Sequence, residues 1–257
     1  MAYRNPKFYT AHMFRLSPAL VASDFAVGTP LGLLYDGKQK QLFRFAGAEL
    51  FHALQVTGLP AGHLADTVII PDGHNINGDN IVLEHSAGAF PGTSVLNEVV
   101  PAGLYISSQW VAVADAGWRV SIGPNNSTQW HLGEFVITLE RELVRGPVVS
   151  WSQGNLANLF RSETQAGIAS SRVLGATRLT WRATWDQMNE SDVAQVLDML
   201  EDIGGAAFPF YFLPPDTRFN LGLYEMERPV TTLIATSLTA AGSPRYRMTL
   251  DLVEALG

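Results

Sequence analysis

The sequence contains no cysteine, which excludes disulfide bonds, thiolate metal sites and cysteine nucleophiles. It also lacks long hydrophobic runs. Stretches such as residues 208–213 are far shorter than the roughly 20 residues that cross a bilayer, so we expect no membrane insertion. Residues 1–6, Met-Ala-Tyr-Arg-Asn-Pro, do not have the charged and then apolar pattern of a signal peptide. We therefore expect synthesis in the cytoplasm.

Charge is scarce as well. Only 16% of the residues are charged, against roughly 25% in an average soluble domain, while 47% are hydrophobic. The net charge of −7 is spread along the chain without a run of Lys or Arg, so we expect no nucleic-acid recognition. The excess of apolar residues predicts that a protein interface covers part of the surface. A homo-oligomer is the expected state.

Sequence signatures of catalysis are missing too. There is no Gly-x-Ser-x-Gly elbow, phosphate loop or Gly-x-Gly-x-x-Gly, and no two of the six histidines are three or four residues apart. We predict no enzymatic activity, no cofactor and no bound metal. Two alternatives stay open: Glu140 and Glu142 as the carboxylates of a glycosidase, and Asp72 and Asp79 as calcium ligands in a segment that otherwise reads as a turn.

With 257 residues the chain is long enough for two domains, and its first half has the pattern of a β-sandwich. Between residues 15 and 146, turn residues interrupt short apolar segments every 8 to 12 residues. Residues 1–14 are expected to form an N-terminal arm, and residues 147–174 a linker or an arm that orders against a neighbour. The expected strands here are residues 81–85, 110–113, 118–122 and 134–139.

The second half, residues 175–257, predicts a β-barrel or sandwich module with one α-helix at about residues 190–203. Residues 178–185 alternate apolar and polar, as in a half-buried strand. Asn189 is the expected N-cap, and Gly204-Gly205 the expected end of the helix. Residues 208–213 and 245–252 read as further strands. The predicted buried stripe of the helix is Val193, Val196, Leu197, Leu200 and Ile203, and its predicted solvated face is Glu190, Asp192, Asp198, Glu201 and Asp202. The fold class is therefore mainly β.

A resemblance emerges from five segments of the first half. They are residues 32–37 (Gly-Leu-Leu-Tyr-Asp-Gly), 43–45 (Phe-Arg-Phe), 72–78 (Asp-Gly-His-Asn-Ile-Asn-Gly), 118–122 (Trp-Arg-Val-Ser-Ile) and 132–135 (Leu-Gly-Glu-Phe). In this order they resemble a galactose-binding-like (discoidin-type) jelly roll of the kind found in tailed-phage proteins. Members that bind sugars use loops at one end of the sandwich. The candidate glycan contacts are His63, His74, Asn75, Asn125, Asn126 and Trp130.

The second half resembles the barrel-with-one-helix module of phage distal tail and tail-tube proteins, on the order of strand 180–185, helix and aromatic strand 208–212. This resemblance implies a structural virion component of the tail tip or baseplate, made in the host cytoplasm. It would form a ring of six or three copies that contacts tube, hub, tape-measure and fibre proteins. The alternative is a carbohydrate-recognition module of a receptor-binding tail protein, with a host surface glycan as ligand. The candidate assembly residues are Trp151, Phe160, Trp181, Trp185, Phe210 and Phe212.

Overall fold

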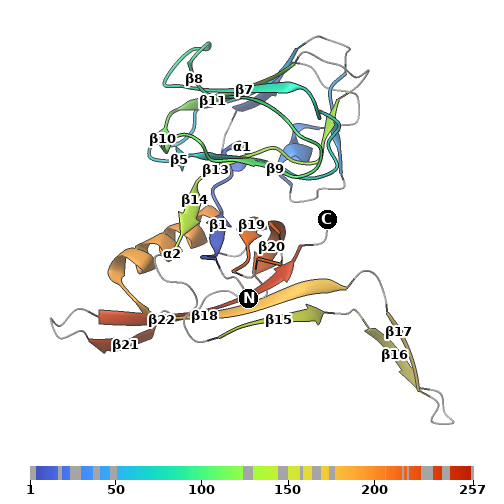
Figure 1. Cartoon of the computed structure of the whole chain (residues 1–257), viewed down its shortest axis with the longest axis vertical. Helices are drawn as coiled ribbons and strands as arrows, with labels where there is room; N and C mark the ends of the chain where they lie inside the picture. The colour runs from blue at the N-terminus through green and yellow to red at the C-terminus, as the bar shows by residue number, and fades with distance from the viewer. Residues whose placement is uncertain are drawn as a thin grey trace. The chain divides into compact units, whose positions relative to one another are not determined.

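The computed structural model divides into two compact units, and each is described by itself (Figure 1). Tyr9–Arg141 forms the sandwich unit, while Met1–Phe8 and Glu142–Leu256 form the sheet unit. None of the described helices is long and apolar enough to span a membrane. The structure describes residues 4–16, 19–23, 30–36, 41–46, 51–123, 130–143, 150–156, 159–163, 169–173, 177–205, 207–215, 217–218, 220–226, 234–238 and 244–255.

The sandwich unit is built from antiparallel sheets. Its five-stranded sheet has the order β2 (Ala19–Ala22), β4 (His52–Thr57), β11 (Gly117–Gly123), β7 (Asn80–Ser86) and β8 (Thr93–Val99). A three-stranded sheet has the order β13 (Val136–Thr138), β6 (Thr67–Ile70) and β9 (Tyr105–Ser107). Two short pairs join β10 (Val113–Ala114) to β5 (Leu64–Ala65) and β12 (His131–Leu132) to β3 (Phe43–Arg44). The helical turns are α1 (Met13–Leu16) and the 3-10 turn Leu31–Leu34.

One apolar core joins the two larger sheets of this unit. Val120 and Leu83 of the five-stranded sheet belong to the same buried cluster as Val68 and Ile137 of the three-stranded sheet. Alternate residues of β4 and β7 are buried, as expected for strands with one face against a core. The predicted jelly-roll sandwich is therefore confirmed as the fold of this half.

Two expectations for the sandwich unit need a change. Residues 110–112 are not a strand, because only Val113 and Ala114 pair, with Ala65 and Leu64. The described residues of the expected N-terminal arm, residues 4–14, are also largely buried. Phe8 is part of the core of the sheet unit, and Met13 and Phe14 are part of the sandwich core, because each finds an apolar pocket in its own unit.

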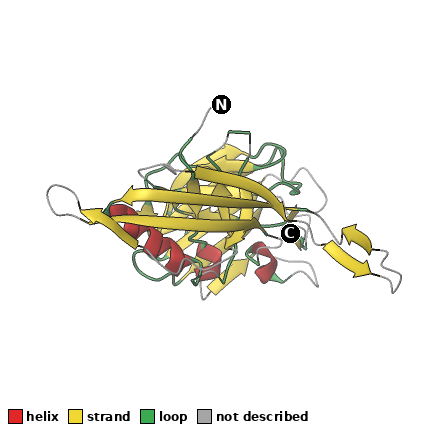
Figure 2. Cartoon of the chain, turned by 90° about the horizontal axis from the view of Figure 1, so that it is seen from below, coloured by secondary structure: helices red, strands yellow, loops and turns green. Residues whose placement is uncertain are grey.

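The sheet unit holds an eight-stranded sheet. Its order is β14 (Glu140–Glu142), β1 (Lys7–Tyr9), β19 (Phe210–Leu213), β20 (Gly222–Met226), β22 (Pro244–Glu254), β18 (Arg178–Met188) and β15 (Ser150–Leu156), and β21 (Ile234–Leu238) also pairs with β22. A separate hairpin joins β16 (Leu159–Glu163) to β17 (Ala169–Val173). Figure 2 views this sheet from below. The segment predicted as a linker or arm thus contains β15 and the hairpin.

The alternation predicted in β18 determines which side of this sheet faces the core. Trp181, Ala183 and Trp185 are buried, whereas Arg182 between them is exposed. They pair with Leu252, Leu250 and Met248 of β22, which are also buried. The opposite face carries polar pairs: Arg182 with Asp251, Thr184 with Thr249 and Asp186 with Arg247. The sheet therefore has one apolar face and one hydrophilic face.

The helix α2 (Glu190–Asp202) begins at Asn189, as predicted. The Asn189 side chain accepts a hydrogen bond from the Asp192 backbone, and the Asp192 carboxylate accepts one from the Asn189 backbone. Gly204 and Gly205 follow with positive φ, which suits glycine after a helix. The fully buried stripe consists of Val196, Met199 and Ile203. Two predictions for the faces of the helix were wrong: Leu197 is 54% exposed and does not belong to the buried stripe, and Asp192 is 1% exposed and does not belong to the solvated face.

Candidate functional site

The segment of residues 72–79 is a turn held by its own polar groups. The Asp72 carboxylate accepts a hydrogen bond from the Gly73 backbone (2.8 Å), and Asp79 donates its backbone N–H to Ile76 (3.1 Å). Gly73 and Gly78 have φ of 97° and 85°, a conformation that suits glycine in tight turns. This arrangement favours the turn over the calcium loop. Among the described residues, no three His, Asp or Glu side chains gather as a metal site.

His74 and Asn75 are engaged within the sandwich. His74 Nε2 donates to the Gly103 carbonyl oxygen (2.8 Å), and Asn75 Oδ1 accepts from the His131 backbone N–H (2.7 Å). Burial, and then the positive charge of Arg44, lower the pKa of His131. These two hydrogen bonds connect neighbouring loops at this end of the sandwich. His74 Nε2 and Asn75 Oδ1 therefore already have partners within the protein.

The remaining candidate glycan contacts are dispersed. Trp130 is fully buried and lies against His52 and Phe45, with ring centroids 4.7 and 6.2 Å away. It fills the core and offers no stacking face. His63 is half-buried in the loop that leaves β4 at Thr57, at the opposite end of the five-stranded sheet from residues 74–75. Asn125 and Asn126 lie outside the described residues.

A second cluster, at the end of the sandwich where β7 finishes, did not emerge from the sequence. His85 Nδ1 lies 2.5 Å from Asp115 Oδ2, and the two side chains are 15% and 19% exposed. The His85 ring lies 5.5 Å from that of buried Trp118, which is 6.4 Å from Trp110. Trp110 donates its Nε1–H to the Ala65 carbonyl oxygen and is half-buried. Of the sandwich's three tryptophans, Trp110 is the one that keeps access to solvent.

One signal for this cluster was available. His85 shares the inward face of β7 with Ile81 and Leu83, so a buried-facing imidazole in need of a partner could have been expected. Its partner Asp115 is 30 residues away in the sequence, and no spacing rule predicts that contact.

The candidate assembly aromatics lie mostly in the core of the sheet unit. Trp181, Trp185, Phe210 and Phe212 are all at most 2% exposed, because β18 and β19 turn their apolar faces inward. This corrects the expectation that they line an assembly surface. The backbones of Trp151 and Phe160 run in β15 and β16, and their side chains lie outside the described part.

The strand β15 has a different character from the core strands. It pairs with β18 on one side and ends the described sheet on the other. Ser152, Gln153, Gly154 and Asn155 are all exposed, although successive residues of a strand point to opposite faces. No part of the described chain covers either face of β15 at these positions, and the strand is held by its backbone pairing with β18.

The carboxylates considered for a glycosidase both have hydrogen-bond donors. Glu140 Oε2 accepts from the Tyr9 hydroxyl (3.0 Å), and Glu142 Oε1 accepts from the Asn5 amide (2.6 Å). Glu140 and Glu142 are both in the edge strand β14. These contacts explain the two residues as structural groups.

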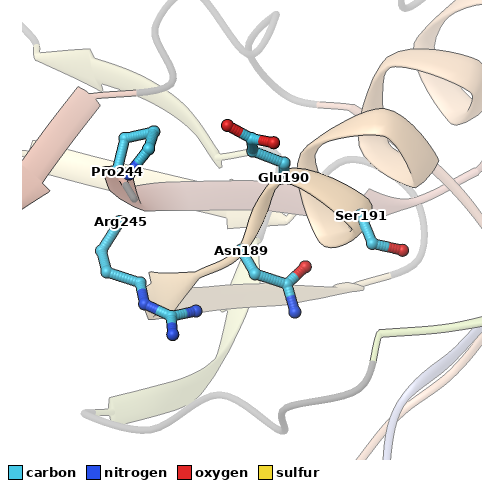
Figure 3. A pocket seen from close by; sticks show the side chains of 5 residues that line it. All are labelled: Asn189, Glu190, Ser191, Pro244 and Arg245. Carbon is cyan, nitrogen blue, oxygen red and sulfur yellow. The ribbon is translucent and has the colours of Figure 1, made fainter. Parts of the chain in front are cut away.

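A shallow cavity of about 300 Å³ opens beside the start of α2. Asn189, Glu190 and Ser191 line one side, and Pro244 and Arg245 of β22 line the other (Figure 3). The Asn189 side chain is used to cap the helix. One carboxylate and one guanidinium balance each other in the lining, so the cavity has no strong preference for a charged ligand.

No protein-family model matches the sequence, and no curated protein matches it. Solved structures do match about half of the chain. A chitosan-binding module from a chitosanase/glucanase of Paenibacillus sp. IK-5 is 16% identical, with a TM-score of 0.42, covering 50% of this chain and 98% of that one. The family 32 carbohydrate-binding module from C. perfringens NanJ, in complex with galactose, is 12% identical, with a TM-score of 0.43, covering 52% and 99%.

A Ruminococcus gnavus GH29 fucosidase in complex with fucose is 10% identical, with a TM-score of 0.41, covering 48% of this chain but only 25% of that one. None of these three structures is described as a phage tail protein. Likeness at this level does not assign the chain to any of these families.

Proposed function

We propose that the chain is a non-catalytic structural protein that assembles with copies of itself through the sheet unit. The observation that carries this proposal is the edge strand β15, Ser-Trp-Ser-Gln-Gly-Asn-Leu, which has seven residues without a charge or a proline. Soluble proteins usually blunt such an edge with a lysine, a proline, a bulge or a very short strand, because its unpaired backbone groups bind other strands. No described strand pairs with this edge of β15, so an edge of this length favours pairing with another chain.

The hairpin of β16 and β17 adds to this support. It follows β15 after two residues, and its strands pair only with each other among the described strands. In Figures 1 and 2 it lies beyond the end of β15. A two-stranded hairpin is at best marginally stable alone in water. A neighbouring copy would supply the missing surface, which fits the low charged fraction of 16%.

In its finer form, the proposal places these copies in a ring at the tail tip of a phage, as a distal tail or baseplate protein made in the host cytoplasm. The resemblance of strand, helix and aromatic strand in the sheet unit supports this form. The tube, hub, tape-measure and fibre proteins would be its neighbours. The carbohydrate-binding modules found by structural comparison lend nothing to this finer form.

The experiment is a measurement of mass in solution, by light scattering and mass photometry, from nanomolar to micromolar protein. We expect the wild-type chain to form oligomers, and the double variant Gln153→Lys/Asn155→Lys to remain monomeric because it restores the charge that edge strands normally carry. The matched control is Ser108→Lys/Gln109→Lys, two exposed positions in the sandwich unit, which should assemble like the wild type. A wild-type chain that stays monomeric throughout, or a lysine variant of β15 that still assembles, would contradict the proposal.

Carbohydrate recognition by the sandwich unit is the second candidate. The observation in its favour is Trp110, half-buried next to Trp118, with the His85–Asp115 pair beyond it. A sugar ring binds through stacking on an aromatic face and hydrogen bonds to a few fixed polar groups. Chitotriose and galactose, bound by structural neighbours, are suitable probes. We expect binding to be lost in Trp110→Ala and kept in Phe51→Ala, an exposed aromatic control; equal binding by both variants would count against this site.

A further inference from the structure

The sheet unit has a second edge strand without charge or proline, on the other side of the same sheet. The strand β21 pairs with β22, and Tyr246 of β22 pairs with both Ala235 of β21 and Met188 of β18. Since a strand has one neighbour on each side, β21 and β18 lie on opposite sides of β22. In the described sheet, β21 has no partner beyond β22, and its sequence Ile-Ala-Thr-Ser-Leu has no charge and no proline.

We infer that copies of this chain join head to tail, the free edge of β15 in one copy pairing with the free edge of β21 in the next. This inference rests on the proposed self-assembly and specifies which surfaces meet. A two-fold contact between two β15 strands would leave both β21 edges open. The head-to-tail contact covers both kinds of edge with one type of interface, and such an interface closes into a ring when its rotation allows.

The composition of the other edge strands selects this pair. Both β15 and β21 are uncharged, so neither places a charge in the new pairing. In contrast, β14 is Glu-Arg-Glu and only three residues long, and the hairpin strands include Arg161, Glu163 and Arg172. Charged, short strands are the protected kind of edge. Within the sheet unit, β15 and β21 are the edge strands without charge or proline, although the pairing of β21 with β22 shifts register between Ala235 and Ser237. This arrangement would bury both of them.

The positions of the two edges also suit a closed sheet. Gln153, in the middle of β15, pairs with Trp181 of β18, which in turn pairs with Leu252 of β22. In β21, Ala235 pairs with Tyr246 of β22. At about 3.3 Å per residue, the two edges are offset by about 20 Å along the strands. Joining offset edges staggers successive copies, and a stagger with tilted strands is what a closed β-barrel requires. The offset thus staggers successive copies, and the rotation between them decides whether they close into a ring or continue as an open filament.

The absence of cysteine allows a direct test by disulfide mapping. Gln153→Cys marks the middle of β15 and Thr236→Cys the middle of β21, with Ala235→Cys and Ser237→Cys to sample neighbouring registers. Under oxidation, we expect the double variant Gln153→Cys/Thr236→Cys to give a ladder of covalent oligomers on a non-reducing gel. Each single variant should stay monomeric on the gel, and an equal mixture of the two single variants should stop at dimers.

Other outcomes separate the two ideas. Efficient dimers from Gln153→Cys alone would indicate two-fold contact and overturn the head-to-tail inference while leaving self-assembly intact. The head-to-tail inference would also be overturned, with self-assembly intact, if the wild type forms oligomers in light scattering but β15 cross-links to none of the three β21 positions. Monomers in light scattering would overturn both. As a control, Glu142→Cys on the charged edge, mixed with Thr236→Cys, should give no dimers.

Discussion

The sheets of the two units end in different ways. In the sandwich unit, the edge strands are short, as in β2, β9 and β13 with three or four residues, or interrupted, as in β8, which carries Glu98 and a register shift beside Leu83. In the sheet unit, β15 has seven residues without charge or interruption in its pairing with β18. The sandwich edges are of the kind that resists pairing, whereas the edge of the sheet unit is of the kind that invites it.

This difference separates two tasks within one chain. The sandwich unit buries its large residues in one closed core and satisfies many loop groups internally, so it has the properties of an independent module. The sheet unit has an equally buried core under α2, yet it continues past that core into β15 and a hairpin. None of the described side chains of β15 belongs to that core, so we expect this strand to act in contact with other molecules.

The largest expected effect tests whether each unit depends on its own core. Trp118→Ala and Trp185→Ala each remove a fully buried ring, from the sandwich unit and the sheet unit respectively. Each should cost about 3–5 kcal/mol of stability, and differential scanning calorimetry should place the loss in the melting of one unit only. Equal shifts of every transition in both variants would mean that the two cores unfold as one. The exposed control Phe51→Ala should change stability by no more than about 0.5 kcal/mol.

The next effect concerns acid and is confined to the sandwich unit. Complete burial, with a smaller effect of Arg15, holds the pKa of His12 well below its usual value. In the unfolded chain the His12 imidazole is protonated below about pH 6.5, whereas in the folded unit it stays neutral to a lower pH. The folded unit therefore keeps its full stability above that pH and loses stability as the pH falls below it. The chain should therefore be less stable at pH 5 than at pH 7. Urea unfolding at pH 5 and 7 measures it.

The matched variant is His12→Phe, which keeps a ring beside Phe14 and Tyr35. It should lose most of this difference between pH 5 and pH 7. An unchanged acid sensitivity in His12→Phe would assign the effect to other groups.

A smaller effect is expected at the start of α2 in the sheet unit. Asn189→Ala removes the side-chain half of a reciprocal cap and leaves the Asp192 backbone N–H without its acceptor. The cost should be about 1 kcal/mol, seen as a lower urea midpoint of the sheet unit with the sandwich unit unchanged. Asn189→Ser should restore most of it, because serine also caps helices. No loss in the alanine variant would show that packing alone fixes the helix.

The smallest effect is expected on the hydrophilic face of the sheet unit. Arg182, with a side chain 66% exposed, lies 3.4 Å from Asp251. An exposed ion pair of this kind contributes at most about 1 kcal/mol, and often nothing measurable. Arg182→Ala should leave both the unfolding midpoint and the oligomer mass unchanged. A change in mass with an unchanged midpoint would add this face to the assembly surface and extend the comparison beyond the edges.

Periodic signals in the sequence predicted much of the fold. The alternation at Trp181 and Trp185 and the capping residue Asn189 lie where expected, because a strand face and a helix start are decided by residues close in sequence. The candidate site residues were less predictable. Trp130 was offered as a glycan contact but fills the core, and the pair of His85 and Asp115 was not found. Whether a loop residue points inward depends on contacts distant in sequence.

The sequence by itself determined that the chain is mainly β, with one long helix and little charge, since these follow from composition and local periodicity. Only the tertiary structure decided which strand ends a sheet. The uncharged sequence of β15 would suit a central strand equally well. It is an edge strand because it pairs with β18 on one side and no described strand pairs with it on the other. Strand order is a property of long-range pairing, and the unprotected edge that supports self-assembly exists only at that level.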